Sequence, residues 1–220
     1  MKIIFFGDSI TDSSRERGSS DAGRVAENHL TVPRAYGSGY VFLTATELFY
    51  EQPGKYQILN RGIGGDRLPQ LYARVALDVW RETPDVLSIL IGFNDIDPGE
   101  NPNPTYLERW GRVYRMLIKD TLESCPDTKI MILEPFAVRN PEKAYTLARY
   151  REVLAYAKEA RRIAEEFSLP FVELQEKIDE AVEKYGIDAV LYDGTHPNLV
   201  GSKVISDAWL RVFRENFGEN

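Results

Sequence analysis

The chain has very little cysteine and histidine, and this scarcity excludes several kinds of chemistry. Cys125 is the single cysteine among 220 residues, so no disulfide can form within the chain and no cysteine cluster can bind zinc. It stands before a proline in a turn-like stretch, and we expect a structural role for it. The two histidines are His29 and His196. Any mechanism that needs an imidazole must therefore use one of them.

Long apolar runs are also missing. No stretch approaches the roughly 18 consecutive apolar residues that a membrane-spanning helix requires. The apolar run at residues 2–6 is too short for a signal peptide, and Gly-Asp follows it rather than a small-residue cleavage site. These features predict a cytoplasmic protein that does not bind membranes.

Basic residues are outnumbered, with 27 Lys and Arg against 34 Asp and Glu and a net charge of −7. Nucleic-acid binding favours a basic face, so we expect no nucleic-acid partner. Hydrophobic residues make up 43% and charged residues 28%, which is ordinary for a globular protein. With no repeat or linker in the sequence, we expect a single domain over residues 1–220, and a homo-oligomer is compatible with it.

Short apolar runs alternate with longer amphipathic segments. Runs without polar alternation suit strands that are buried on both faces of a parallel sheet. The predicted strands are Lys2–Phe6, Gln57–Asn60, Val86–Ile91, Lys129–Leu133 and Pro170–Val172. The predicted helices are Tyr40–Tyr50, Leu68–Trp80, Tyr106–Leu122, Ala144–Phe167, Glu173–Tyr185 and Leu199–Phe217. This order predicts an α/β fold, a three-layer α/β/α sandwich with a central parallel sheet of about five strands.

Polar loops follow the first three predicted strands, where parallel sheets bind their ligands. Residues 7–11 contain Ser9, which is placed either to face a cleft or to cap a helix. Residues 60–66 contain three glycines, but Arg67 stands where a dinucleotide-binding loop would have its last glycine. After the third strand, Asn94 is either an amide donor at a site or a turn residue.

A fourth polar segment, residues 192–198, precedes the last predicted helix. The spacing of Asp193 and His196 lets the carboxylate bond to Nδ1–H and leaves Nε2 to accept a proton. The alternative is an exposed loop histidine. The four segments should converge at one edge of the sheet and together supply a nucleophile, a base, an orienting acid and hydrogen-bond donors. Acyl transfer through a tetrahedral intermediate requires these parts.

These segments resemble, in order and across nearly the whole chain, the sequence blocks of the SGNH hydrolases, also called the GDSL esterase/lipase family. Residues 7–11 resemble the nucleophile block, residues 60–66 the glycine block, residues 92–95 the Gly-x-Asn-Asp block and residues 193–197 the Asp-x-x-His block. The resemblance implies the flavodoxin-like SGNH-hydrolase architecture, and a serine esterase that needs no metal or organic cofactor.

The resemblance also assigns roles to residues. Ser9 is the nucleophile, His196 the general base and Asp193 the residue that orients it. The oxyanion hole combines the backbone N–H groups of Ser9 and Gly65 with the side-chain amide of Asn94. Gly65 is preferred to its neighbour because the functional glycine of the family directly precedes a polar residue, as Gly65 does here.

The expected substrate is a short-chain ester. Residues 37–40 resemble a segment of carbohydrate-deacetylating members, including those similar to acetyl xylan esterases. The polar stretch from Ser13 to Ser38 also lacks an apolar run for an acyl chain. We therefore expect an O-acetyl ester of a small molecule or oligosaccharide, with Tyr192 and Trp209 as candidate sugar contacts, although Trp209 suits a helix core better. Residue His29 is incidental or contacts substrate.

Other readings stay open. The family also includes lysophospholipases, thioesterases and broad lipase-esterases. A metal-dependent hydrolase would use the carboxylates of Asp8, Asp12, Asp95 and Asp193. A phosphatase of the haloacid dehalogenase type would need a second aspartate where this chain has Ile10. A non-catalytic sugar-binding protein would bind a substrate without turnover.

Overall fold

The computed structural model describes residues 1–17, 33–96, 104–139 and 144–218. Within these residues the centre of the molecule is a sheet of five parallel strands in the order β2-β1-β3-β4-β5. The strands are β1 (Lys2–Gly7), β2 (Gln57–Gly62), β3 (Val86–Leu90), β4 (Lys129–Leu133) and β5 (Phe171–Val172). The prediction of a parallel sheet of about five strands is confirmed.

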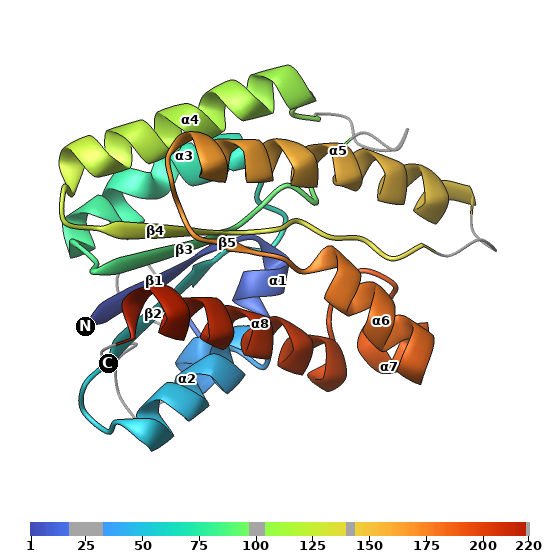
Figure 1. Cartoon of the computed structure of the whole chain (residues 1–220), viewed down its shortest axis with the longest axis horizontal. Helices are drawn as coiled ribbons and strands as arrows, with labels where there is room; N and C mark the ends of the chain where they lie inside the picture. Colours follow the sequence, from blue (N-terminus) through green and yellow to red (C-terminus); the bar gives the residue numbers. More distant parts are fainter. Residues whose placement is uncertain (18–32, 97–103, 140–143, 219–220) are drawn as a thin grey trace.

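Helices cover both faces of this sheet, which makes the predicted three-layer sandwich (Figure 1). One face carries α3 (Leu68–Asp78), α4 (Leu107–Ser124) and α5 (Ala144–Glu166). The other carries α2 (Tyr40–Glu51), α6 (Gln175–Tyr185), α7 (Ile187–Val190) and α8 (Leu199–Phe217). Three short elements complete the described chain: α1 (Ser9–Asp12) and the 3-10 helices η1 (Pro33–Tyr36) and η2 (Trp80–Glu82).

Each face has its own apolar core, because successive side chains of a strand point to opposite sides of the sheet. In β1, Phe5 lies in one core and contacts the rings of Tyr40 and Trp209, with centroids 5.8 and 5.0 Å away. Phe6 lies in the other core, which also contains Trp110. Burial on both faces is the reason that the strand sequences lack polar alternation.

Short elements and element ends differ from the sequence predictions. The strands β1 and β2 run on to Gly7 and Gly62, and β3 ends one residue early, at Leu90. The predicted helix over Leu68–Trp80 ends at Asp78, and a 3-10 turn follows. The helices α1 and α7 were not predicted, because four residues are too few to show helical periodicity.

Several residues singled out in the sequence are core residues. Trp209 is fully buried and donates to the hydroxyl of Ser88 at 2.9 Å, so it does not face a sugar. Cys125 is also buried, in agreement with a structural role. His29 and much of the polar segment 13–38 lie outside the described residues. Among the residues that are described, no helix has both the length and the apolar character to cross a membrane.

Candidate active site

Ser9 follows a turn that leaves no room for a side chain at Gly7. A Cβ there would lie 2.4 Å from both the Leu90 carbonyl and the Thr11 hydroxyl. The chain therefore turns sharply from β1 into α1, and the Asp8 carboxylate caps this helix by accepting from the N–H of Ile10 at 3.0 Å. Ser9 is the first helical residue rather than the cap, and its side chain is partly exposed.

The histidine lies in a loop that is held by its own aspartate. The carboxylate of Asp193 accepts from the backbone N–H groups of Thr195 and His196, at 2.9 and 2.7 Å. An isolated bridge pairs Leu191 with Pro197 at the base of this loop. These contacts form within seven consecutive residues, so the loop is locally determined.

Ser9, His196 and Asp193 form a continuous chain of contacts. Nε2 of His196 lies 2.8 Å from Oγ of Ser9, and Nδ1 lies 2.6 Å from Oδ2 of Asp193. Burial acts to raise the pKa of Asp193, but the hydrogen bonds from His196 and Thr195 outweigh it and hold the pKa below its usual value. Asp193 therefore stays ionised beside the ring, and the structure brings together three residues from opposite ends of the sequence.

The glycine loop after β2 forms a tight turn beside this chain of contacts. The N–H of Asp66 donates to the carbonyl of Ile63 at 3.2 Å, and Gly65, the third residue of the turn, has a φ of +81°. That position favours glycine because other residues rarely adopt a positive φ. The N–H of Gly64 donates to the Asp12 carboxylate at 3.3 Å. Since the N–H of Gly64 is engaged, Gly65 is the better candidate of the two for a donor to substrate.

The loop after β3 is tied to the glycine loop. The side-chain nitrogen of Asn94 donates to the carbonyl of Asp66 at 3.0 Å. Both carboxylate oxygens of Asp95 accept from the N–H of Leu68, at 3.1 and 3.2 Å, which anchors the start of α3. An amide nitrogen has two N–H groups, so the contact that orients Asn94 is compatible with a second donation.

Two buried aspartates near the site have strongly raised pKa values. Burial raises the pKa of Asp8 to about 7, and the nearby carboxylates of Asp95 and Asp66 act in the same direction. Burial likewise raises the pKa of Asp95 to about 7. Both groups are thus partly protonated near neutral pH.

The four aspartates of the metal hypothesis do not gather around one point. Asp12 accepts from Arg17 at 2.5 Å, Asp95 accepts from Leu68, and Asp193 accepts from His196. In the described part of the chain, no group of three or more His, Cys, Asp or Glu side chains is placed to hold a metal ion. The described side chains therefore do not fit the metal-dependent hydrolase.

A cavity of about 330 Å³ opens beside Ser9 and His196. The hydroxyl residues Ser13, Ser14 and Ser38 and the ring of Tyr192 contribute to its lining. Tyr192 is 66% exposed, and its ring stacks on the His196 ring with a centroid distance of 5.7 Å and an interplanar angle of 18°. The lining thus combines polar groups with the aromatic face of Tyr192 and with the apolar side chains of Ile10, Pro197 and Leu199.

In this site a carboxylate, an imidazole and a hydroxyl lie in line at the carboxyl edge of a parallel sheet. Serine hydrolases have this arrangement. Comparison with known proteins agrees. The model of the GDSL-like Lipase/Acylhydrolase family matches residues 5–204. The chain belongs to this family, and it is a carboxylic ester hydrolase.

Individual relatives cover almost all of the chain. An acetylxylan esterase of Geobacillus stearothermophilus is 30% identical over 218 residues, which are 96% of this chain and 92% of that protein. A protein of Parabacteroides merdae that has been assigned as a GDSL-like lipase has a similar structure, with a TM-score of 0.85 and 35% identity over 96% of this chain and 94% of that one. A catalytic mutant of Axe2, an acetylxylan esterase of Geobacillus stearothermophilus, has a TM-score of 0.81 and 28% identity over 96% and 93% of the two chains.

The contacts of Asp12 carry no signal in the sequence, where Asp12 is only a candidate metal ligand. It lies three residues after Ser9, so the two share one helical turn, but α1 is too short to be predicted. Its glycine partner, Gly64, lies 52 residues further along the chain, and its arginine partners, Arg15 and Arg17, follow it directly after the turn at Ser13 and Ser14.

Proposed function

We propose that Ser9, His196 and Asp193 are the catalytic residues of this ester hydrolase and that it acts through an acyl-enzyme. The observation that carries the proposal is the 2.8 Å contact between Oγ of Ser9 and Nε2 of His196. A nucleophile within hydrogen-bond reach of a base, which a third group orients in turn, is the signature of covalent hydrolysis.

In the first half-reaction, Oγ of Ser9 attacks the ester carbonyl carbon while Nε2 of His196 takes the hydroxyl proton. Asp193 holds the ring through Nδ1 and stabilises the imidazolium that forms. The tetrahedral intermediate collapses, the bond to the alcohol oxygen breaks, and His196 gives its proton to the leaving alcohol. Water then attacks the acyl-enzyme with the same base, which releases the acid and restores Ser9.

The negative charge of the intermediate requires donors that are already in place. We assign them as the N–H groups of Ser9 and Gly65 and the side-chain amide of Asn94. Gly65 has the positive φ that its turn requires, and Asn94 is held by the Asp66 carbonyl. Removal of one such donor in comparable sites costs about 3–4 kcal/mol of transition-state stabilisation.

We further propose that the substrate is an O-acetyl or similar short-chain ester of a carbohydrate. Both the sequence relative and the mutant Axe2 structure described above are acetylxylan esterases of Geobacillus stearothermophilus, and the similarity extends over nearly the full length of this chain. The cavity beside Ser9 supports this reading, because three serines and the exposed ring of Tyr192 line it, and its apolar residues, Ile10, Pro197 and Leu199, leave room for a short acyl group. Hydroxyls and an aromatic face suit a sugar, whereas a long acyl chain would need an apolar groove.

The acyl preference can be measured with p-nitrophenyl esters. We expect hydrolysis of the acetate, with a steep decline in kcat/KM beyond butyrate, and release of acetate from acetylated xylo-oligosaccharides. Activity that rises with chain length would instead favour the lysophospholipase or thioesterase alternative. Incubation with EDTA should leave the activity unchanged.

The catalytic assignment is tested by Ser9→Ala and His196→Ala. Each should lower kcat by at least about 10⁴-fold, because the members of such a triad act as a unit. Thermal melting of each variant should stay close to that of the wild type. Ser124→Ala, at an exposed position near the end of α4, is the matched control and should keep full activity. If His196→Ala retained most of the activity, the assignment of the base would be wrong.

A further inference from the structure

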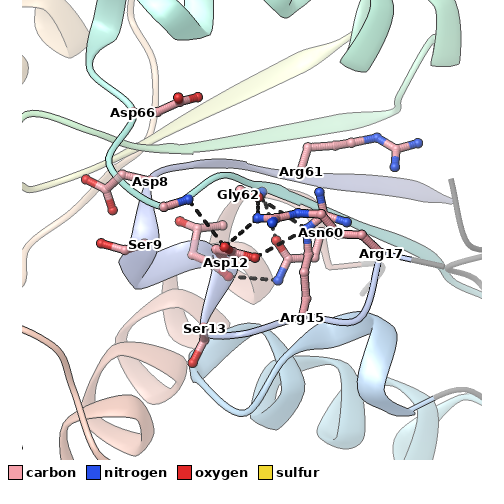
Figure 2. Close-up of polar contacts among 12 residues, drawn as sticks. Asp8, Ser9, Asp12, Ser13, Arg15, Arg17, Asn60, Arg61, Gly62 and Asp66 are labelled. Carbon is pink, nitrogen blue, oxygen red and sulfur yellow. Dashed lines mark hydrogen bonds and ion pairs between the residues drawn. The ribbon is translucent and has the colours of Figure 1, made fainter. Parts of the chain in front are cut away.

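Asp12 is a buried carboxylate between the turn that carries Ser9 and the glycine loop. It is 9% exposed. Its Oδ2 accepts from the N–H of Gly64 at 3.3 Å and from the guanidinium of Arg17 at 2.5 Å. Its Oδ1 lies 3.6 Å from Nε of Arg15. Figure 2 shows this group of contacts, with Ser9 and Asp12 on the same turn.

Two consecutive residues with positive φ bring the arginines into place. Ser13 and Ser14 have φ values of 42° and 57°, which are unusual for residues other than glycine. The chain reverses there, so that Arg15 donates from Nε to the carbonyl of Gly62 at 3.2 Å. The segment after α1 thus folds back over the end of β2. Backbone strain of this kind persists only where surrounding contacts hold it.

The nucleophile turn rests directly on the glycine loop. A Cβ at Gly62 would lie 2.2 Å from the backbone nitrogen of Asp12, so no side chain fits between the two segments. A Cβ at Gly64 would lie 3.9 Å from Cβ of Ser9 and 3.7 Å from Oδ2 of Asp12. Gly64 therefore has Ser9 on one side and the Asp12 carboxylate on another.

A loop with adjacent glycines needs such an anchor. Glycine has more backbone freedom than any other residue type, so the adjacent Gly64 and Gly65 can adopt many conformations. A donor in an oxyanion hole stabilises charge only when it is already aimed at the developing oxygen, and a displacement of about 1 Å can cost about 100-fold in rate. The hydrogen bond from Gly64 to Asp12 fixes the residue that precedes the Gly65 N–H.

We propose that Asp12 is a positioning residue that holds the Gly64–Gly65 turn at a fixed distance from Ser9. The two arginines balance its negative charge, so that the carboxylate does not oppose the charge that develops on the oxyanion. The inference rests on the proposed function, because it takes Ser9 as the nucleophile and the N–H of Gly65 as a donor. Asp12 also lines the cavity beside Ser9, and in this proposal it acts through the N–H of Gly64.

Two substitutions at Asp12 separate its role as an acceptor for Gly64 from its charge. Asp12→Ala removes the acceptor for Gly64 and the partner of Arg17, and it should lower kcat for p-nitrophenyl acetate by about 10- to 100-fold, with KM within about threefold. Asp12→Asn keeps an oxygen for the N–H of Gly64 and should lose less than about tenfold. Asp207→Ala, which breaks an exposed ion pair with Lys203 on α8, is the matched control and should behave as the wild type.

The binding of phenylboronic acid distinguishes positioning from a merely structural role. Boronic acids add to a reactive serine and form a tetrahedral anion that uses the same donors as the intermediate. We expect the dissociation constant of this adduct to rise in Asp12→Ala by the factor that kcat/KM falls. A merely structural residue would change the melting temperature and leave both values intact in the folded protein, and that result would overturn the proposal.

The failures of the two proposals differ. If Ser9→Ala were as active as the wild type, the proposed function would fail. If Ser9→Ala were inactive while folded Asp12→Ala kept the wild-type kcat/KM, only the positioning role would fail. Should Asp12→Ala not fold, Arg17→Gln and Asp12→Asn decide the question together. Because Arg17 acts through Asp12, the loss of kcat in the double variant Arg17→Gln/Asp12→Asn should be smaller than the product of the two single losses. A loss equal to that product would count against the proposal.

Discussion

At the scale of single residues, the backbone near the site is as specific as the reactive side chains. Gly7 lets β1 turn into α1, Asp8 caps that helix, and Ser9 is left as its first residue with the hydroxyl toward His196. Asp193 binds two backbone N–H groups of its own loop as well as the imidazole ring. The same carboxylate thus shapes the loop and orients the imidazole ring that we propose as the base.

Asn94→Ala tests the amide assigned to the oxyanion hole. The loss of one donor should lower kcat by about 10²- to 10³-fold and change KM much less, because the donor matters most in the transition state. Steady-state kinetics on p-nitrophenyl acetate measure both values. Asn216→Ala, near the end of α8, is the control. A kcat that does not change would remove Asn94 from the oxyanion hole.

Asp8→Asn tests the raised pKa of the buried cap. The pKa of Asp8 is about 7 in the folded protein, above its usual value of 3.8, so the folded state holds this proton more tightly than the unfolded state. The stability that this group contributes is complete below its usual pKa and is lost as the pH rises through about 7. An asparagine keeps the cap oxygen and does not ionise.

The difference in unfolding free energy between Asp8→Asn and the wild type should therefore shift in favour of the variant from about pH 5 to about pH 8. Urea unfolding at both pH values measures this shift. Asp127→Asn, at an exposed turn position, should show no comparable shift. A difference that does not depend on pH would contradict the pKa of the buried group.

At the scale of elements, the histidine loop is placed by the packing of α7 on α8. Asn198 caps α8 by accepting from the N–H of Val200 at 3.0 Å, and it donates to the carbonyl of Asp188 in α7 at 2.9 Å. A Cβ at Gly201 would lie 2.4 Å from the Val190 carbonyl and 3.0 Å from Cβ of Pro197. The glycine in α8 thus permits the close approach that carries His196 to Ser9.

Gly201→Ala should separate these elements. The added methyl group has no space, and we expect a loss of about 1–3 kcal/mol in unfolding free energy together with a lower kcat, because Pro197 directly follows the base. Chemical denaturation and ester hydrolysis measure the two effects. Lys203→Ala, on the exposed side of the same helix, is the control. Wild-type stability in Gly201→Ala would show that the helices can shift at little cost.

At the scale of the whole molecule, the two cores make the sheet a rigid base for the loops at its carboxyl edge. Trp209 links α8 to the sheet, because its ring contacts that of Phe5 in β1, with centroids 5.0 Å apart, and its N–H donates to Ser88 in β3. Both Trp209 and Ser88 are fully buried. The contact therefore lies in the core, away from the proposed chemistry.

Trp209→Phe should lower stability and spare catalysis. The variant leaves the buried Ser88 hydroxyl without this donor and removes part of the aromatic packing, so we expect a loss of about 1–3 kcal/mol in unfolding free energy. The value of kcat below the melting transition should stay within about twofold of the wild type, since the site lies in other loops. A large loss of kcat in fully folded protein would contradict this separation of core and site.

Strong local patterns were predictable, and long-range polar contacts were not. The five strands and six longer helices were predicted to within a few residues, because each buries a continuous apolar run or an apolar face. The one-turn helices α1 and α7 were missed, since their four residues carry no periodic signal. The contact of Asp12 with Gly64 was also missed, because it joins two segments 52 residues apart whose relative placement the pattern does not contain.

The class of fold, the family blocks and the loop in which Asp193 meets His196 follow from the order of the residues alone, because these features depend on local periodicity and short spacings. The packing of the loops, by contrast, places Ser9 against an imidazole 187 residues away and Asp12 against the glycine loop, 52 residues away. Contacts of that kind depend on how the sheet orders its strands and how closely the loops pack at its edge.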